Sequence, residues 1–380
     1  MCIRFNFTIM ESRYTTLCQS LEVLKKTGVP LLIEGDTGVK PFLGDDLGSY
    51  YFILKLSEFF NISIDLSVFL FYGGLIAISL ILGIIGFYLL FKKPICRDIT
   101  LLGLFLLTLV SFNIWDVYVA FFFASVSIVP LFLYFSKNKS MSNYFFVLIF
   151  FSGIVISLAN YIRSHSGTSV FVFITFIILF NERILFKRKC LLLIILIIGF
   201  LIPFLFSSSI LKSRDNYLRK INPTYQLQAT RHTFWHTIYC GLGFLNNKYG
   251  IEWLDEYAFN KAHSKSPQVT PYSKEYENII KKEVLNLIKK DFFFIIETIF
   301  AKLGVILFYV LIFANFGLLA RFFYPQKWYI ELAFILAFGF NLLFGILAIP
   351  RPECLLGLFS FSTLYGIMSI NKAIEDRFSV

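Results

Sequence analysis

Long apolar blocks separated by polar connections are the feature that most constrains this chain. Crossing a bilayer as a helix takes about 20 apolar residues, fewer where neighbouring helices shelter the segment. Blocks that approach this length cover residues 66–91, 99–113, 117–135, 144–160, 168–180, 190–206, 292–314, 328–348 and 354–370. The chain is 57% apolar, whereas soluble domains are roughly 45–50% apolar. We therefore predict an all-α polytopic membrane protein with about nine transmembrane helices.

The positions of Lys and Arg predict how these helices are oriented. One alternating set of connections is rich in Lys and Arg, whereas the opposite short connections hold only Arg163 and Arg351. The rich set comprises Lys92, Lys93, Arg97, Lys137, Lys139, Arg183, Lys187, Arg188, Lys189, Arg321, Lys327, Lys372 and Arg377. Since basic loops stay in the cytoplasm, we place this set there. The net charge of +11 then reflects topology, and no motif indicates a nucleic-acid partner.

Four regions follow from this topology. We expect an extracytoplasmic N-terminal loop over 1–65, transmembrane helices over 66–206, an extracytoplasmic loop domain over 207–291 and C-terminal transmembrane helices over 292–380. Residues 273–300 show apolar positions at helical spacing. That helix either lies on the outer membrane surface or belongs to a small fold of the loop domain itself.

The N-terminal loop raises a difficulty of insertion, because no apolar span precedes it. Either a first transmembrane helix is missing from this chain, or the first clear span inserts with its N-terminus outside. We favour a missing helix, since residues 11–38 resemble part of a folded outer loop rather than the start of a protein.

Two neighbouring carboxylates, Asp45 and Asp46, lie between glycines just before the first apolar block. On the predicted topology they are outside, at the membrane surface. There they could accept a proton from an attacking hydroxyl or hold a divalent metal against a phosphate. Gly-Asp-Asp is also good turn chemistry, so a solvated turn is the simpler interpretation.

The segments GDDLGSYYFILKLSEF (44–59) and NIWDVY (113–118) resemble the GT-C superfamily of integral membrane glycosyltransferases, such as protein mannosyltransferases and lipid A aminoarabinose transferases. The resemblance implies a polyprenyl-phosphate sugar donor and an acidic residue in the first outer loop that serves as base or orients the acceptor. It assigns this role to Asp46, or to Asp45, and a second acidic position to Asp116. Asp116 is equally well interpreted as an interfacial acid within an aromatic belt.

Arginines in outer segments are candidates for binding the phosphate of the donor. Arg163 and His165 lie in the glycine-containing turn RSHSGT, where a guanidinium and exposed backbone N–H groups suit phosphate. Arg231 and Arg351 are further candidates, the latter between the prolines of IPRPECL. The alternatives are a polar turn that caps two helices and an arginine at the lipid head groups.

The segment 231–262 is dense in polar and aromatic residues and is the predicted acceptor or sugar site. His232, Trp235 and His236 could line a cleft, because aromatic faces stack on sugar rings and imidazoles bind hydroxyls. The two histidines have a spacing that can bind zinc, but the Glu of an HExxH motif is absent. We therefore predict no metal ligands, and a divalent cation is left open as a cofactor.

Together these features favour a membrane glycosyltransferase at the outer face of the cytoplasmic membrane. Its partners would be a polyprenyl-phosphate sugar donor, a lipid or glycan acceptor and membrane lipids. An O-antigen ligase or polymerase type of enzyme is the alternative, with the loop 207–291 as its functional domain. A transporter or flippase for a lipid-linked sugar is less favoured, because the ionisable residues gather in loops rather than within spans.

Overall fold

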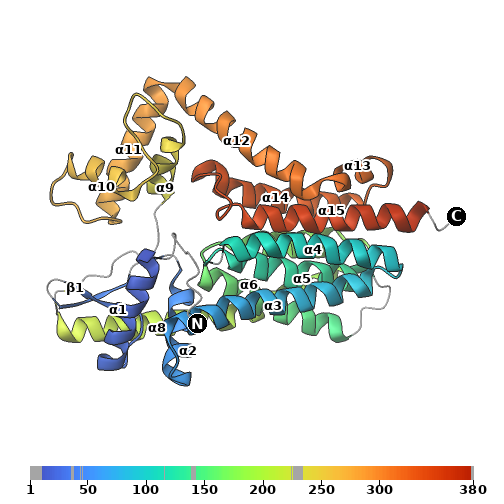
Figure 1. The fold of residues 1–380 in the computed structure, drawn as a ribbon, viewed down its shortest axis with the longest axis horizontal. Coiled ribbons are helices and arrows are strands. Elements are labelled where there is room, and N and C mark those ends of the chain that lie inside the picture. Colours follow the sequence, from blue (N-terminus) through green and yellow to red (C-terminus); the bar gives the residue numbers. More distant parts are fainter. Residues whose placement is uncertain are drawn as a thin grey trace, which may run out of the picture.

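The computed structural model describes residues 11–35, 38–42, 44, 46–114, 116–137, 143–223, 225 and 234–377. Within these ranges the chain forms fifteen α-helices, one short 3₁₀ helix and one two-stranded hairpin. Figure 1 shows an elongated helical bundle with two smaller lobes at one end and the C-terminus at the other.

The bundle contains seven helices that are long and apolar enough to cross a membrane, so the chain is a multi-pass, helical membrane protein. They are α3 (Ile64–Leu90), α4 (Pro94–Ile114), α5 (Val119–Lys137), α6 (Asn143–Ile162), α8 (Phe186–Ile221), α12 (Phe292–Ala314) and α14 (Trp328–Leu347). The remaining two expected blocks form α7 (Thr168–Phe180), which has only 13 residues, and the largely buried α15 (Leu356–Arg377). A total of about nine crossings stays a prediction.

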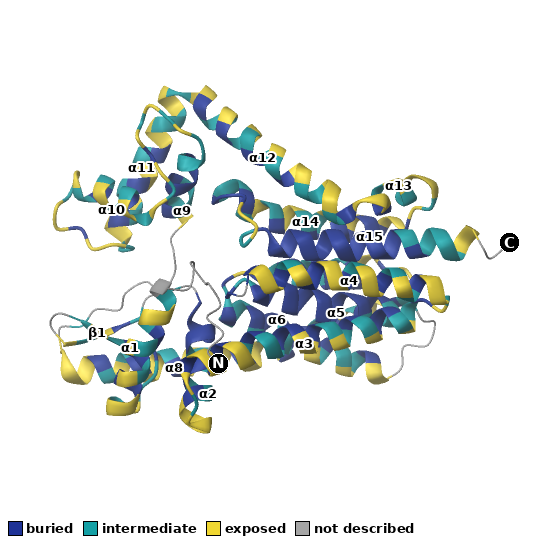
Figure 2. Cartoon of the chain, viewed as in Figure 1, coloured by how far each residue is buried: buried dark blue, intermediate teal, exposed yellow. Residues whose placement is uncertain are grey.

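Helices α5 and α15 occupy the centre of the bundle (Figure 2). The apolar window of α5 is 83% buried, compared with 17% for α12, whose remaining residues are left for lipid.

The backbones of α6 and α8 approach each other closely at glycines. At the α6–α8 contact a Cβ on Gly199 would fall on the carbonyl oxygen of Phe150, and one on Gly153 would fall on that of Leu196. Small residues at such contacts are how membrane helices associate.

The first lobe (the N-terminal lobe) consists of α1 (Glu11–Thr27), β1 (Leu32–Gly35), β2 (Gly38–Pro41) and α2 (Leu47–Phe60), together with the end of α8. Val23, Leu32 and Leu218 form a small buried core that joins α1 and the hairpin to α8. Helix α8 has 36 residues, far more than the about 20 that a bilayer needs. It therefore continues beyond the bundle and ends at Ile221 rather than near residue 206, where the apolar block ends.

The second lobe (the late lobe) consists of α9 (Phe234–Gly241), the 3₁₀ turn Leu242–Phe244, α10 (Asp255–His263) and α11 (Lys274–Lys290). Tyr276, Ile280 and Val284 of α11 are buried in a core shared with α9 and α10. Of the two interpretations of this helix, the packing therefore matches a small fold of the loop domain itself. Asp291 accepts a hydrogen bond from the backbone N–H of Phe294 and so begins α12, which returns to the bundle.

Several of the basic connections gather beside the end of α15, away from both lobes. Lys93 donates to the carbonyl of Ile374 at 3.3 Å, and Lys372 donates to that of Pro325. The small helix α13 (Phe316–Phe323) lies in the same region, where Arg321 pairs with Glu331. These described basic residues and the two lobes thus lie at opposite ends of the bundle, where Figure 1 places α13 and the end of α15 far from α1 and α10.

Candidate active site

A cavity of about 650 Å³ lies where the two lobes meet the end of the bundle. This volume is within the roughly 300–1,000 Å³ typical of small-molecule sites. Its polar wall is built from segments far apart in the chain: Arg13, Asp46, Tyr118, Arg163, His165, His236, Asn341 and Asp255. Of the residues predicted from the sequence, Asp46, Arg163, His165 and His236 are therefore brought together.

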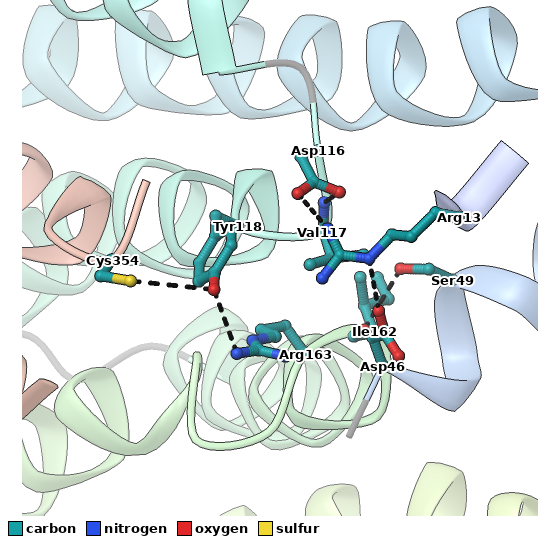
Figure 3. Close-up of polar contacts among 9 residues, drawn as sticks. All are labelled: Arg13, Asp46, Ser49, Asp116, Val117, Tyr118, Ile162, Arg163 and Cys354. Carbon is teal, nitrogen blue, oxygen red and sulfur yellow. Dashed lines mark hydrogen bonds and ion pairs between the residues drawn. The ribbon is translucent and has the colours of Figure 1, made fainter. Parts of the chain in front are cut away.

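Arg13 of α1 joins the two predicted acids (Figure 3). Its Nε donates to Oδ2 of Asp46 at 3.0 Å, and its Nη1 forms an ion pair with Asp116. The Asp46 side chain is 5% exposed, and that of Asp116 is 1% exposed. Asp46 is thus no solvated turn residue, so that simpler interpretation is wrong for its side chain. Asp116 is buried in a pair with Arg13.

The two acids have different positions relative to the cavity. Asp46 is the N-cap residue of α2, but its side chain makes no capping hydrogen bond and instead contacts Arg13 beside the cavity. Asp116 accepts the N–H of Val117 at 2.7 Å in the connection between α4 and α5. It is outside the described lining of the cavity. Asp46 can therefore meet a substrate, whereas Asp116 holds Arg13 in place.

The turn that follows α6 presents Arg163 to the same cavity. Arg163 Nη2 donates to the hydroxyl of Tyr118 at 3.2 Å, and its guanidinium carbon lies 4.7 Å from the centroid of that ring. Residue His165 has a φ of 66°, a left-handed conformation that is uncommon for a non-glycine residue. Gly167 packs so closely on Ile156 that a Cβ would meet its carbonyl oxygen. This tight turn holds Arg163 and His165 at the end of the bundle.

His236 forms the centre of a third polar group, on the wall contributed by the late lobe. Its Nδ1 is 2.6 Å from the hydroxyl of Tyr276, and its Nε2 is 3.1 Å from Oδ1 of Asp255. The Sγ atom of Cys240 is 3.8 Å from the same Nε2. The imidazole is 1% exposed, whereas Asp255 is 48% exposed, so the group opens to the cavity through the carboxylate. Burial raises the pKa of the Cys240 thiol to about 12, so without a metal this thiol keeps its proton near pH 7.

The other wall of the cavity is apolar. Helix α14 contributes Phe340, Leu343, Phe344 and Leu347. The ring of His165 lies 6.3 Å from that of Phe344, where the polar and apolar walls meet. Such a cavity suits a ligand with a polar head and an apolar chain.

The structure places the other predicted residues elsewhere or does not describe them. Arg351 is exposed in the connection between α14 and α15 and is outside the described lining of the cavity. Lys281 of α11 covers the ring of Trp235, with its Nζ atom 5.6 Å from the ring centroid. The neighbouring Phe234 lines the cavity instead. Asp45, Arg231 and His232 lie outside the described residues.

The residues of the site that are missing from the sequence prediction include Arg13, Tyr118, Cys240 and Asn341. Nothing local distinguishes Arg13 from a surface arginine of an amphipathic helix, since both of its partners are distant in the chain. Cys240 was detectable, because it follows His236 by four residues and the two therefore share a face of α9.

Comparison of the chain with family models, curated proteins and solved structures finds no match.

Proposed function

We propose that this chain is a GT-C-like membrane glycosyltransferase that moves a sugar from a polyprenyl-phosphate donor to an acceptor at the outer face of the cytoplasmic membrane. One observation carries the proposal: a carboxylate, Asp46, and a guanidinium, Arg163, from separate segments line one cavity beside the end of the bundle. A base and a phosphate-binding cation are the two groups that such a transfer needs.

Asp46 is the proposed base. In the transfer the acceptor hydroxyl forms a bond to the anomeric carbon of the sugar, and the bond from that carbon to the phosphate oxygen breaks. The proton of the hydroxyl passes to Asp46, and the electron pair leaves with the polyprenyl phosphate. The ion pair with Arg13, at 3.0 Å, fixes the orientation of the carboxylate. A fixed orientation supports this role, because a base must be held within hydrogen-bonding distance of the hydroxyl whose proton it takes.

Arg163 is the proposed partner of the leaving phosphate. Its guanidinium is already oriented by the ring and hydroxyl of Tyr118, so little reorganisation is needed as negative charge develops on the phosphate. His165 belongs to the same turn and lines the same cavity. The apolar residues of α14 opposite this turn would accommodate the first isoprene units of the donor.

The ligase or polymerase alternative is supported by a different observation. Arg163 and His236 line the same cavity, and an enzyme of that type would depend on this Arg and His without an early acid. The two proposals therefore differ in the importance of Asp46.

Replacement of Asp46 by Asn tests the proposal. We expect transfer from a polyprenyl-phosphate sugar in isolated membranes to fall roughly 100-fold or more, as for removal of a general base, with membrane abundance unchanged. Asp65→Asn is the matched control, because Asp65 is an exposed acid at the start of α3 whose contact is the hydroxyl of Tyr14. Full activity in Asp46→Asn together with loss in Arg163→Ala and His236→Ala would favour the ligase type of enzyme instead.

A further inference from the structure

We propose that His236, Cys240 and Asp255 form a binding site for a transition-metal dication of the zinc class, open to the cavity. The three residues offer one nitrogen, one sulfur and one oxygen atom, all within 4.8 Å of one another. Nitrogen, sulfur and carboxylate oxygen are the ligands that zinc takes in proteins. The inference is independent of the proposed glycosyl transfer, because it depends only on this cluster.

The two distances from His236 to the other ligand atoms are close to those around a tetrahedral ion. Zinc bonds of about 2.0–2.3 Å imply ligand atoms about 3.3–3.6 Å apart around a tetrahedral centre. Here Nε2 of His236 is 3.1 Å from Oδ1 of Asp255 and 3.8 Å from Sγ of Cys240. These two separations differ from the tetrahedral value by a few tenths of an ångström. The third, between Sγ of Cys240 and the Asp255 carboxylate, lies within 4.8 Å, and a change of side-chain torsion at the half-exposed Asp255 would bring the carboxylate closer to the thiol.

The backbone holds the three residues together. His236 and Cys240 are four residues apart on α9 and thus on one face, and Asp255 is the first residue of α10. Helix α9 is fixed to the bundle at Gly241, where a Cβ would fall on the carbonyl oxygens of Leu347 and Ala348. All three residues therefore lie on helices, which position ligands more precisely than loops do.

Neighbouring tyrosines supply the outer contacts that orient metal ligands. Nδ1 of His236 is 2.6 Å from the hydroxyl of Tyr276, so an Nδ1–H donor to that oxygen leaves the Nε2 lone pair directed at the ion. Tyr272 donates to the second carboxylate oxygen of Asp255 at 3.4 Å. Zinc-bound histidines regularly have such a partner on the other ring nitrogen.

The charges and the burial also suit a dication. A thiolate and a carboxylate together offset two positive charges, and the rings of Phe259, Tyr272 and Tyr276 surround the imidazole at 5.2–5.9 Å. The 48% exposure of Asp255 leaves one side open toward the cavity. Three protein ligands with an open fourth position are the pattern of a site that binds water or substrate at the metal.

The competing arrangement is a metal-free chain of hydrogen bonds, in which Tyr276 donates to Nδ1 and Nε2–H donates to Asp255. Cobalt(II) distinguishes the two, because a cobalt–thiolate bond gives a near-ultraviolet charge-transfer band. We expect the purified full-length chain, treated with a chelator and then titrated with Co²⁺, to bind one ion and develop this band.

Substitutions show which side chains bind the Co²⁺ ion. Cys240→Ser should abolish the band, and Asp255→Asn should weaken Co²⁺ binding at least tenfold. Cys354→Ser is the matched control, since Cys354 is another cysteine that lines the cavity, and it should bind as the wild type does. Lack of stoichiometric binding by the folded wild-type chain, or a band that survives in Cys240→Ser, would overturn the proposal. No sugar donor is needed, so this result and that of the transfer assay are independent.

Discussion

Asp46, which precedes α2, and Asp116, which follows α4, are bound by one guanidinium, that of Arg13 (Figure 3). This link ties α1 of the N-terminal lobe to the connection between α4 and α5. The pairing suggests that Arg13 has two tasks: it positions the proposed base, and it neutralises a fully buried carboxylate. The two tasks can be separated by substitution.

Replacing Arg13 by Met should destabilise the protein. The change leaves Asp116, which is 1% exposed, without its counter-charge, and breaking a buried pair in this way costs about 3 kcal/mol or more. We expect a lower thermal unfolding temperature for the purified chain in detergent. The double variant Arg13→Met with Asp116→Asn should recover part of the loss, because it removes the buried charge as well. A single variant as stable as the wild type would show that Asp116 does not need this partner.

Replacing Arg163 by Lys should weaken donor binding more than folding. A lysine keeps the charge but loses the planar fork and the stacking on Tyr118. In the transfer assay we expect KM for the polyprenyl-phosphate sugar to rise about tenfold or more, with unfolding temperature little changed. Arg351→Ala is the control, because Arg351 is exposed and outside the described lining of the cavity. Equal effects of the two changes would count against a phosphate site in the turn after α6.

The bundle was predictable because a helix that crosses the lipid must be apolar over about 20 residues, and such runs can be counted in the sequence. The same signal fails where a helix leaves the lipid: α8 continues from residue 206 to Ile221 through the polar sequence SSSILKSRDNYLRKI. The low hydropathy of this sequence indicates contact with water, although the backbone is still helical. The hairpin of β1 and β2 was missed for a similar reason, since strands of four residues carry almost no periodic pattern.

The site was predictable only in part, because side-chain direction depends on helix phase. Asp46 and Arg163 were found from their places next to apolar blocks. Trp235 was expected at the cavity, but its neighbour Phe234 is there instead. Successive helical residues point about 100° apart. Composition alone does not tell which of two adjacent aromatic residues on α9 faces the cavity. Arg13 required knowledge of the tertiary fold.

Replacing Gly199 by Leu should separate α6 from α8. A Cβ on Gly199 would fall on the carbonyl oxygen of Phe150, and overpacking of a tight contact costs about 1–3 kcal/mol. We expect a lower unfolding temperature and less protein in the membrane. Gly304→Leu is the control, because nothing lies within 4 Å of a Cβ at Gly304 on the exposed face of α12. If both variants accumulate and unfold as the wild type does, the helices do not pack through Gly199.

The reactivity of Cys240 should depend steeply on pH in chelator-treated protein. Burial raises the pKa of this thiol to about 12, and only the thiolate reacts with alkylating reagents. Between pH 7 and pH 10 the thiolate fraction should therefore rise about tenfold for each pH unit, and the rate of alkylation with it. Peptide mass spectrometry after iodoacetamide treatment measures this rate separately for each cysteine.

Saturating Zn²⁺ should suppress the reaction of Cys240 and leave that of the exposed Cys190 unchanged. A rate at Cys240 that is independent of pH, or is unaffected by Zn²⁺, would contradict a neutral thiol that becomes a metal ligand by losing its proton.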